Sequence, residues 1–508
     1  MEERRSIDLS KTSPRNDSRQ TAPPLIFESG SPGRSGFFWA EEEKSDWIPS
    51  KFVRSEIAGF PEMGELEVLR HFTLLSHLNF SIEGQFYPLG SCTMKYNPKI
   101  NEVVARFPGL STIHPQAPTS LLQGALELLH DLEGMLLEIS GMDGVTLQPA
   151  AGAQGELTGL MMIRAYLATQ GNPRKKIIVP DTAHGTNPAS SSLCGYDVVQ
   201  IPSNERGIID AEKVREVMDE EVAALMITNP NTLGLFEQNI QSIAEVVHGK
   251  GGLLYMDGAN LNAIMGIAKP GHMGVDALHM NLHKTFSTPH GGGGPGAGPV
   301  AVKGVLRDFL PIPRIVKGNS RYELSENFPS SVGRVRSFLG NFGVLVRAYS
   351  YIISQGSDGL EETSRMAVLN ANYIRKRLEK EYHLPYSEPC MHECVFTDRQ
   401  QQKLGVHTMD IAKRLLDYGF HPPTIYFPLV VSGALMIEPT ESESPETLDQ
   451  FVDAMISIAQ EARDNPGIVT DAPHSTPVRR LDEAGAARKL VLRWEESQGD
   501  KNRPKAKP

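Results

Sequence analysis

Short apolar runs alternate with helical segments in the middle of the chain, and this alternation constrains the fold more than any other feature. In chain order the runs read GVTLQ, KKIIVP, DVVQIP, ALMIT, GLLYMD and ALHMNL. Segments with apolar residues at helical spacing, such as DAEKVREVMD and NIQSIAEVVHGKG, separate several of them. Apolar strands that alternate with helices form a parallel sheet covered on both faces. We therefore predict an α/β fold with a mainly parallel sheet.

The residues that follow each apolar run form the candidate site, because ligands of such sheets bind beyond the carboxyl ends of the strands. Five runs end in small or polar residues, which would meet at one rim of the sheet. In chain order these residues are Gly152 to Gln154, His184, Asn229 to Asn231, Asp257 to Asn260, and His283 with Lys284.

Lys284 lies in the segment NLHKTFSTPHGGGGPG, directly after the last of these runs. A lysine at a strand end is placed to form a Schiff base with a carbonyl cofactor, whereas most lysines are solvated surface residues. The glycines 291–294 that follow are costly to order. They form either a floppy loop or a wall where the backbone must approach the cofactor, and we expect the wall.

Two further strand ends supply partners for an aromatic cofactor. Asp257 can pair with a protonated pyridine nitrogen and keep the ring an electron sink, although a helix-capping role is the alternative. We expect His184 to stack on the ring, against the alternative of a polar turn residue. Asn260, three positions after Asp257, is a further cofactor-binding candidate.

A helix that begins with small residues offers backbone N–H groups to an anion. Gly152, Ala153 and Gln154 are therefore the candidates for a phosphate site. The segment matches neither a dinucleotide-binding nor a nucleoside-triphosphate loop. These four features together, the lysine, the aspartate, the histidine and the predicted phosphate site, indicate pyridoxal 5'-phosphate as the cofactor.

Composition narrows the remaining classes of function. The 508 residues carry a net charge of −11, which disfavours a nucleic-acid partner. No run of about 18 apolar residues occurs, so we expect no membrane span. Four cysteines indicate a reducing, cytoplasmic setting. Cys390, His392 and Cys394 alternate like ligands on a strand, but no second pair completes a zinc site, so we expect no metal.

The chain divides into five predicted parts. We expect a disordered tail over residues 1–23, an N-terminal arm over 24–118, and the large α/β domain over 119–339. A smaller α+β domain then covers 340–470, and a C-terminal extension with a second tail covers 471–508.

Six segments carry a resemblance to a known family: GSCTMKYNP, AGAQGE, AHGTNPAS, NPNTLGLFE, DGANLNA and NLHKTFSTPHGGGGPG. They resemble the P-protein of the glycine cleavage system, the pyridoxal-phosphate-dependent glycine decarboxylase. A single copy of each motif makes the chain similar to subunit 2 of the split form. The resemblance implies pyridoxal-phosphate fold type I, the aspartate-aminotransferase-like fold, with the cofactor covalently held on Lys284.

The resemblance also implies a reaction and partners. Glycine would displace Lys284 from the cofactor and lose carbon dioxide, and its aminomethyl group would pass to the lipoyl arm of H-protein. Subunit 1 would join in a heterotetramer with two copies of each subunit, in a bacterial or archaeal cytosol.

Other functions and site residues stay open from the sequence. Two other functions compete with this one: a different pyridoxal-phosphate enzyme on the same scaffold, and a subunit that has lost its cofactor. Five more residues are weaker site candidates: Ser91, Thr93, His114, Arg334 and Arg336.

Overall fold

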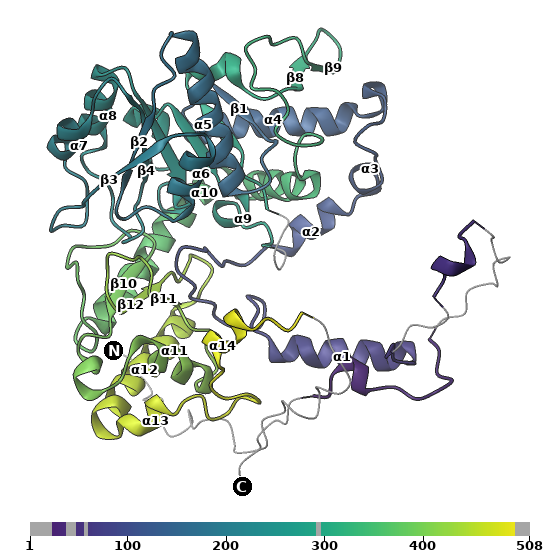
Figure 1. The fold of residues 1–508 in the computed structure, drawn as a ribbon, viewed down its shortest axis with the longest axis vertical. Helices are drawn as coiled ribbons and strands as arrows, with labels where there is room; N and C mark the ends of the chain where they lie inside the picture. Colours follow the sequence, from purple (N-terminus) through teal and green to yellow (C-terminus); the bar gives the residue numbers. More distant parts are fainter. Residues whose placement is uncertain (1–22, 37–46, 55–58, 291–295, 493–508) are drawn as a thin grey trace, which may run out of the picture.

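The computed structural model describes residues 23–36, 47–54, 59–290 and 296–492. A seven-stranded sheet forms the centre of the upper part of the molecule in Figure 1. The strand order is β1-β7-β6-β5-β4-β2-β3. The strands are β1 (Gly144–Thr146), β2 (Lys176–Pro180), β3 (Asp197–Ile201), β4 (Val222–Thr228), β5 (Leu253–Gly258), β6 (Ala277–Met280) and β7 (Val300–Val302). The six predicted runs are β1 to β6, and the short β7 was not predicted.

The strand directions place the predicted site at one rim. Strands β3, β2, β4, β5 and β6 are parallel to one another, while β7 is antiparallel to both β6 and β1. β1 therefore points the same way as β6. The carboxyl ends of β1, β2, β4, β5 and β6 share one edge, and the predicted mainly parallel α/β sheet is confirmed.

Alternating strand residues face two separate cores. Ile178 and Leu254 pack on one face against α4 (Gln123–Ser140), α7 (Ala211–Val217), α8 (Ile240–Gly249) and α10 (Phe342–Leu378). Ile177 and Tyr255 pack on the other face against α5 (Gly152–Thr169), which α6 (Thr186–Leu193) flanks. Burial on both faces explains why these strands read as continuous apolar runs.

A smaller unit lies below the sheet in Figure 1. Its antiparallel sheet has the order β10-β12-β11, formed by β10 (Cys394–Thr397), β11 (Thr424–Ile425) and β12 (Ala434–Ile437). The second half of α10, with α11 (Thr408–Asp417), α12 (Pro445–Asp464) and α13 (Pro466–Thr470), completes its core. Gly356, at φ 64°, interrupts the helical geometry of α10 between the two units.

The N-terminal arm runs outside both units before entering them. Its helices are α1 (Glu65–Leu78), α2 (Lys99–Ala105) and α3 (Pro108–Ser111). The remaining elements are α9 (Leu282–Thr285), the hairpin of β8 (Arg314–Lys317) and β9 (Tyr322–Ser325), and α14 (Glu483–Arg488), besides short 3-10 turns. None of the described helices has the length and apolarity needed to cross a lipid bilayer. The predicted domain boundaries stay predictions, and the predicted tails fall almost wholly outside the described residues.

Candidate active site

Lys284 lies in the single turn of α9, directly beyond the carboxyl end of β6. Its side chain is half-buried, and its Nζ donates to the backbone carbonyl of Ser91 at 2.8 Å. Lys95, a second buried lysine nearby in the fold, is instead paired with Glu441 at 3.0 Å and Asn262 at 2.8 Å. Among the described residues no carboxylate lies within ion-pair distance of the Lys284 amine, so this amine is free of the partner that would hold it as a fixed ammonium.

Asp257, near the end of β5, is the most highly connected carboxylate of the rim. Its Oδ1 accepts the Ala259 N–H at 2.9 Å and lies 3.2 Å from Nε2 of His279. Its Oδ2 accepts a hydrogen bond from the Asn187 amide at 3.1 Å. A carboxylate oxygen has two lone-pair sites, so Oδ2 retains one for a further donor.

The surroundings keep Asp257 ionised despite its burial. Burial by itself raises the pKa of Asp257, but the charge and hydrogen bond of His279, the Ala259 N–H and the Asn187 amide hold it well below its ordinary range. Burial lowers the pKa of His279, but Asp257 more than offsets this and raises it. The imidazole is held in turn by the Tyr255 hydroxyl, 2.7 Å from Nδ1.

His184 is exposed at the end of β2 and does not touch Asp257 directly. Its Nδ1 lies 2.9 Å from the Thr186 hydroxyl, which donates to Glu156 at 2.7 Å. Its ring meets Phe427 edge-on at 5.7 Å between centroids. Burial and the charge of Asp257 raise the pKa of Glu156. His184 therefore has an open face at the rim and a hydrogen-bonded edge that fixes its ring.

Gly152, Ala153 and Gln154 form the first turn of α5, as predicted from the sequence. An added Cβ on Gly152 would lie 2.8 Å from Oδ1 of Asn281 and 3.2 Å from Nε2 of His279, so no side chain fits there. Gln154 is committed to the protein, because it accepts the Ala150 N–H at 2.7 Å and donates to the Val335 carbonyl at 2.9 Å.

Asn260 is buried behind the rim. Its amide donates to the Pro230 carbonyl at 2.9 Å and so fixes the turn after β4. The side-chain amide of Asn260 is thus already bound within the protein. Asn260 would influence a ligand only indirectly, through the position of that turn.

The residues present fit pyridoxal phosphate. Several buried polar atoms around Lys284 have no hydrogen-bond partner in the described part of the chain: Asn281 Oδ1, Thr285 Oγ1, Thr288 Oγ1 and His283 Nδ1. Buried polar groups are normally satisfied, so this rim is built for a polar ligand. The predicted glycine wall, residues 291–294, lies outside the described residues.

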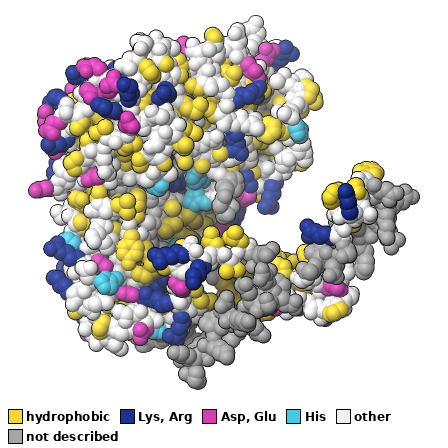
Figure 2. Space-filling model, viewed as in Figure 1, with side chains coloured by type: hydrophobic (Ala, Val, Ile, Leu, Met, Phe, Trp, Pro, Cys, Tyr) yellow, Lys and Arg dark blue, Asp and Glu magenta, His cyan; other side chains and the backbone are white. Residues whose placement is uncertain are grey.

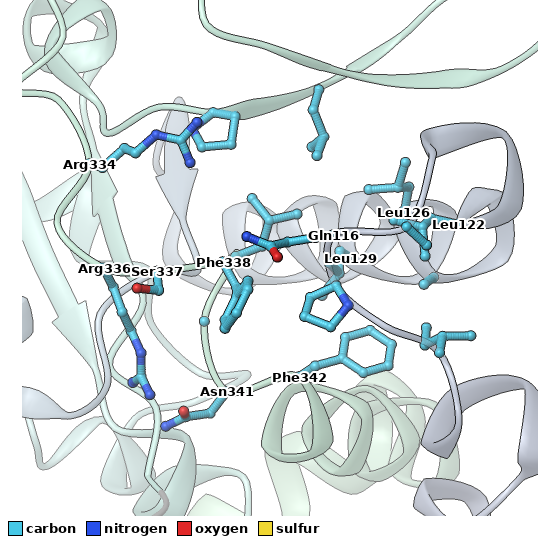
Figure 3. Close-up of a pocket in the computed structure, with 18 of the residues that line it drawn as sticks. Gln116, Leu122, Leu126, Leu129, Arg334, Arg336, Ser337, Phe338, Asn341 and Phe342 are labelled. Atoms are coloured by element: carbon cyan, nitrogen blue, oxygen red, sulfur yellow. The ribbon is translucent and has the colours of Figure 1, made fainter. Parts of the chain in front are cut away.

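A cavity of about 880 Å³ lies next to the rim, between the arm, α4 and the segment that leads into α10. Figure 3 shows Arg336 and Asn341 on one side of it and Leu122 and Leu126 on the other. Asn341 donates to the carbonyl of Gly296, so the cavity adjoins the Lys284 segment without enclosing it. Figure 2 shows this face of the molecule hollowed between its upper and lower parts, with histidine side chains at the border.

Four residues of the site were not assigned from the sequence: Glu156, Asn187, His279 and Asn281. Glu156 and Asn187 lie inside quoted motifs, and their polar positions next to small residues were an available signal. His279 lies within an apolar strand, where a single polar residue on a buried face indicates a partner across the sheet.

Comparisons with known proteins agree with this architecture. Residues 155–294 match the family model described as aminotransferase class-V, and residues 363–475 match glycine dehydrogenase, C-terminal domain. A glycine decarboxylase (P-protein) crystal structure is similar with a TM-score of 0.68 at 20% identity, over 81% of this chain and 93% of that one. An aspartate aminotransferase from Thermus thermophilus has a TM-score of 0.55 at 14% identity, covering 74% and 99%.

These likenesses define the class: a pyridoxal-phosphate-dependent enzyme of the aminotransferase-like fold, with a second, C-terminal domain. The chain is 58% identical over 93% of its length to a probable glycine dehydrogenase (decarboxylating) subunit 2 of Listeria welshimeri, and covers 98% of that protein. The corresponding protein of Bacillus licheniformis is 57% identical with the same coverage. The chain belongs to the glycine dehydrogenase (decarboxylating) subunit 2 family of the glycine cleavage system.

Proposed function

We propose that Lys284 holds pyridoxal 5'-phosphate covalently and that glycine is decarboxylated at this rim. The observation that carries the proposal is the position of the Lys284 amine. It lies at the carboxyl end of β6, on a backbone carbonyl rather than a carboxylate, one strand away from the ionised Asp257. When bound, the cofactor supplies an electron sink for the bond that breaks.

Asp257 and its neighbours orient the ring and keep it effective. The remaining lone-pair site of Oδ2 would accept a hydrogen bond from the pyridine nitrogen, and the negative charge would keep that nitrogen protonated. His279 and Asn187 fix the carboxylate from two other sides. His184 would cover the ring face, since its edge is held through Thr186.

The amino end of α5 would receive the phosphate. The helix has 18 residues, so its dipole and its first N–H groups, at Gly152 and Ala153, which have no partner within the helix, favour an anion. Gln154 contributes by shaping the turn, because its side chain already bridges Ala150 and Val335.

Arg336 is the better of the two arginine candidates for the carboxylate of glycine. Its Nη1 is buried and has no partner among the described residues, whereas Arg334 forms an ion pair with Glu326. Planar guanidinium groups bind carboxylates through paired hydrogen bonds.

The relatives' names supply the expected partners. "Subunit 2" implies a subunit 1, and we infer a heterotetramer with two copies of each chain. The aminomethyl group left after decarboxylation would pass to lipoylated H-protein. We infer a cytoplasmic setting, in line with the four cysteines.

Replacement of Lys284 by alanine tests the proposal. We expect Lys284→Ala to lose both the absorbance of the lysine-bound cofactor and the exchange of bicarbonate with the glycine carboxyl group, assayed with subunit 1 and lipoylated H-protein. Lys269→Ala is the matched control, because this partly exposed lysine pairs with Glu138 away from the rim. A borohydride-reducible cofactor adduct on another lysine of Lys284→Ala would overturn the assignment.

A further inference from the structure

Two buried carboxyl groups face one another behind Lys284. Glu393 directly precedes β10 and Glu438 directly follows β12, and the antiparallel register Cys394↔Ile437 brings the two side by side. Both have no solvent exposure. A like-charged pair cannot remain doubly ionised in such a place without compensation.

One oxygen of each carboxyl group holds the same short turn of the arm. Glu393 Oε2 accepts the N–H of Ser91 at 2.9 Å, and Glu438 Oε2 accepts the N–H of Thr93 at 3.0 Å. Ser91 and Thr93 have φ angles of 66° and 43°, a left-handed conformation that is unfavourable for residues with a side chain. The carboxyl groups thus supply the hydrogen bonds that keep this turn in place.

The turn is also the point where the protein holds the Lys284 amine. Ser91 receives a hydrogen bond from Lys284 on its carbonyl and gives one to Glu393 from its N–H. The amine and Glu393 are therefore joined through the single residue Ser91, and Glu438 holds the same turn at Thr93. The turn also packs closely against β12. A Cβ on Gly90 would lie 2.2 Å from the side chain of Met436, two residues before Glu438.

The other two oxygens point into a closed space. Glu393 Oε1 and Glu438 Oε1 have no hydrogen-bond partner among the described residues, and they lie 3.8 and 3.9 Å from Nε2 of His392. His392 is fully buried, and burial lowers its pKa to about 3, so it is neutral and adds no positive charge. Other titratable groups that face the pair are Lys284, Lys95, Cys92 and Cys390.

We propose that Glu393 and Glu438 share one proton and act as a positioning pair, whose single negative charge and two backbone hydrogen bonds set the Ser91 carbonyl on the Lys284 amine. The inference rests on the proposed role of Lys284. It makes both glutamates positioning residues, since neither touches the amine directly.

The charge state agrees with this arrangement. Burial raises the pKa of Glu438 to about 7, while burial and the charge of Glu438 raise that of Glu393 well above its ordinary range. A carboxyl group that holds its proton in the folded state destabilises the fold as the pH rises. The contribution of Glu438 to the free energy of unfolding is therefore complete below about pH 4.5 and is lost as the pH rises towards 7.

The test uses full-length, cofactor-free protein and the variants Glu393→Gln, Glu438→Gln and the double variant. Glutamine keeps an acceptor for the turn and mimics a protonated carboxyl group. Labelling of Lys284 by an amine-reactive reagent is followed against pH by peptide mass spectrometry. Glu237→Gln is the matched control: Glu237 is buried with a pKa raised to about 7, and it accepts the Ile209 N–H in another part of the fold.

The double variant removes the negative charge behind the amine, so Lys284 should be labelled faster at a given pH than in the unmodified protein. Each single variant should keep a near-normal unfolding temperature and shift labelling less, and Glu237→Gln should leave labelling unchanged. A purely structural role would change the unfolding temperature without moving the labelling curve, and that result would overturn the proposal. So would a stoichiometric metal ion, found by elemental analysis and lost in Glu393→Gln, because the three buried side chains would then be ligands.

Because the labelling needs no cofactor, it separates the two proposals. If Lys284→Ala keeps the cofactor but the labelling shift is seen, the cofactor assignment fails and the charge pair stands. If Lys284→Ala behaves as expected and the shift is missing, only the positioning pair fails.

Discussion

Two carboxylate–imidazole pairs of the large unit differ in their burial and in their position relative to the rim. Asp257 with His279 and Asp276 with His248 are both carboxylate–imidazole pairs, at 3.2 and 2.7 Å. His248 is half-exposed, whereas the His279 pair is fully buried at the ligand rim. The same chemistry is thus structural in one place and available to a ligand in the other.

Replacing Asp257 by asparagine tests the role of its charge. The amide keeps the size of the side chain but cannot hold a pyridine nitrogen protonated, so Asp257→Asn should keep cofactor binding better than turnover. We expect the carboxyl-exchange rate to fall by about 10²-fold or more. Cofactor absorbance and exchange rate measured on the same preparation decide the result, and unchanged turnover would contradict the pyridine role.

Asp276→Asn is the control for that experiment. It removes the charge that pairs with His248, and leaves one amide oxygen to serve the carboxylate oxygen that accepts both the His248 contact and the Leu254 N–H at 2.7 Å, away from the rim. We expect a lower unfolding temperature with an unchanged exchange rate per folded molecule. An equal loss of activity in both variants would mean that Asp257 acts through stability alone.

The sequence predicted residues whose position follows from a strand end, and missed those defined by a distant partner. Lys284, Asp257 and Gly152 follow apolar runs, so their places at the rim could be derived. Glu393 and Ser91 are 302 positions apart, and no local pattern predicts their hydrogen bond. No local pattern indicated that the side-chain amides of Gln154 and Asn260 form hydrogen bonds within the protein.

At the scale of elements, α5 is positioned by small residues that let it approach the sheet closely. An added Cβ on Gly155 would lie 2.9 Å from the His279 side chain, and one on Gly159 would lie 2.4 Å from the Tyr255 ring. Tyr255 in turn holds His279 by its hydroxyl. The spacing of these glycines therefore sets the distance between the helix and the Asp257 pair.

Gly159→Ala should destabilise the protein although alanine is the better helix former. The Tyr255 ring is fully buried and cannot move away, so overpacking should cost about 1–3 kcal/mol in unfolding free energy. Gly134→Ala is the control within α4: its Cβ would meet nothing within 4 Å, and it should stabilise by about 0.5–1 kcal/mol. Denaturant unfolding of both variants measures the difference, and equal effects would contradict the close-packing account.

The arm is joined to α10 by a salt bridge that depends on pH. Nε and Nη2 of Arg347 each donate to an oxygen of the Glu102 carboxylate at 2.8 Å, and this hydrogen bonding lowers the pKa of Glu102 to about 2. A depressed pKa stabilises the fold above the ordinary value of about 4.5, and this contribution is lost as the pH falls towards 2.

Glu102→Gln should therefore lower the unfolding free energy at pH 7 by about 1–3 kcal/mol. The difference from the unmodified protein should shrink as the pH falls below about 4.5. Urea unfolding at a series of pH values measures this, with Glu83→Gln as the control, because the Glu83–Lys99 pair is about half-exposed. A difference that stays constant with pH would rule out the charge as its cause.

The sheet order shows which elements a sequence can and cannot reveal. Six apolar runs predicted six strands, and their parallel direction followed from the helices between them. The reversal at β7 could not be predicted, because its three residues follow a glycine-rich segment and, among the described residues, only the single turn of α9, not a crossover helix, lies between them and β6. The two halves of α10 pack into the cores of different units, and the apolar pattern of the helix does not indicate this division.

At the scale of the whole molecule, helix α1 of the arm carries apolar surface that the described residues leave uncovered. Figure 1 shows α1 extending away from both units, and no residue of this helix is buried. Its exposed apolar side chains are Leu66, Leu69, Phe72 and Leu74. A lone helix of 14 residues is marginal in water, so its stable form requires a covering surface. Subunit 1 is the expected source of that surface.

Replacing Leu69 and Phe72 together by glutamate should prevent assembly without unfolding the chain. Each apolar side chain contributes about 1.5–3 kcal/mol when it is buried, so the double change should weaken binding to subunit 1 by about 10²-fold or more. The unfolding temperature of the isolated chain should stay constant, because neither residue is buried in it. Leu404→Glu, an exposed site in the smaller unit, is the control and should leave binding intact. Sedimentation of the mixed subunits measures assembly, and an arm variant that still sediments with subunit 1 would place the interface elsewhere on the molecule.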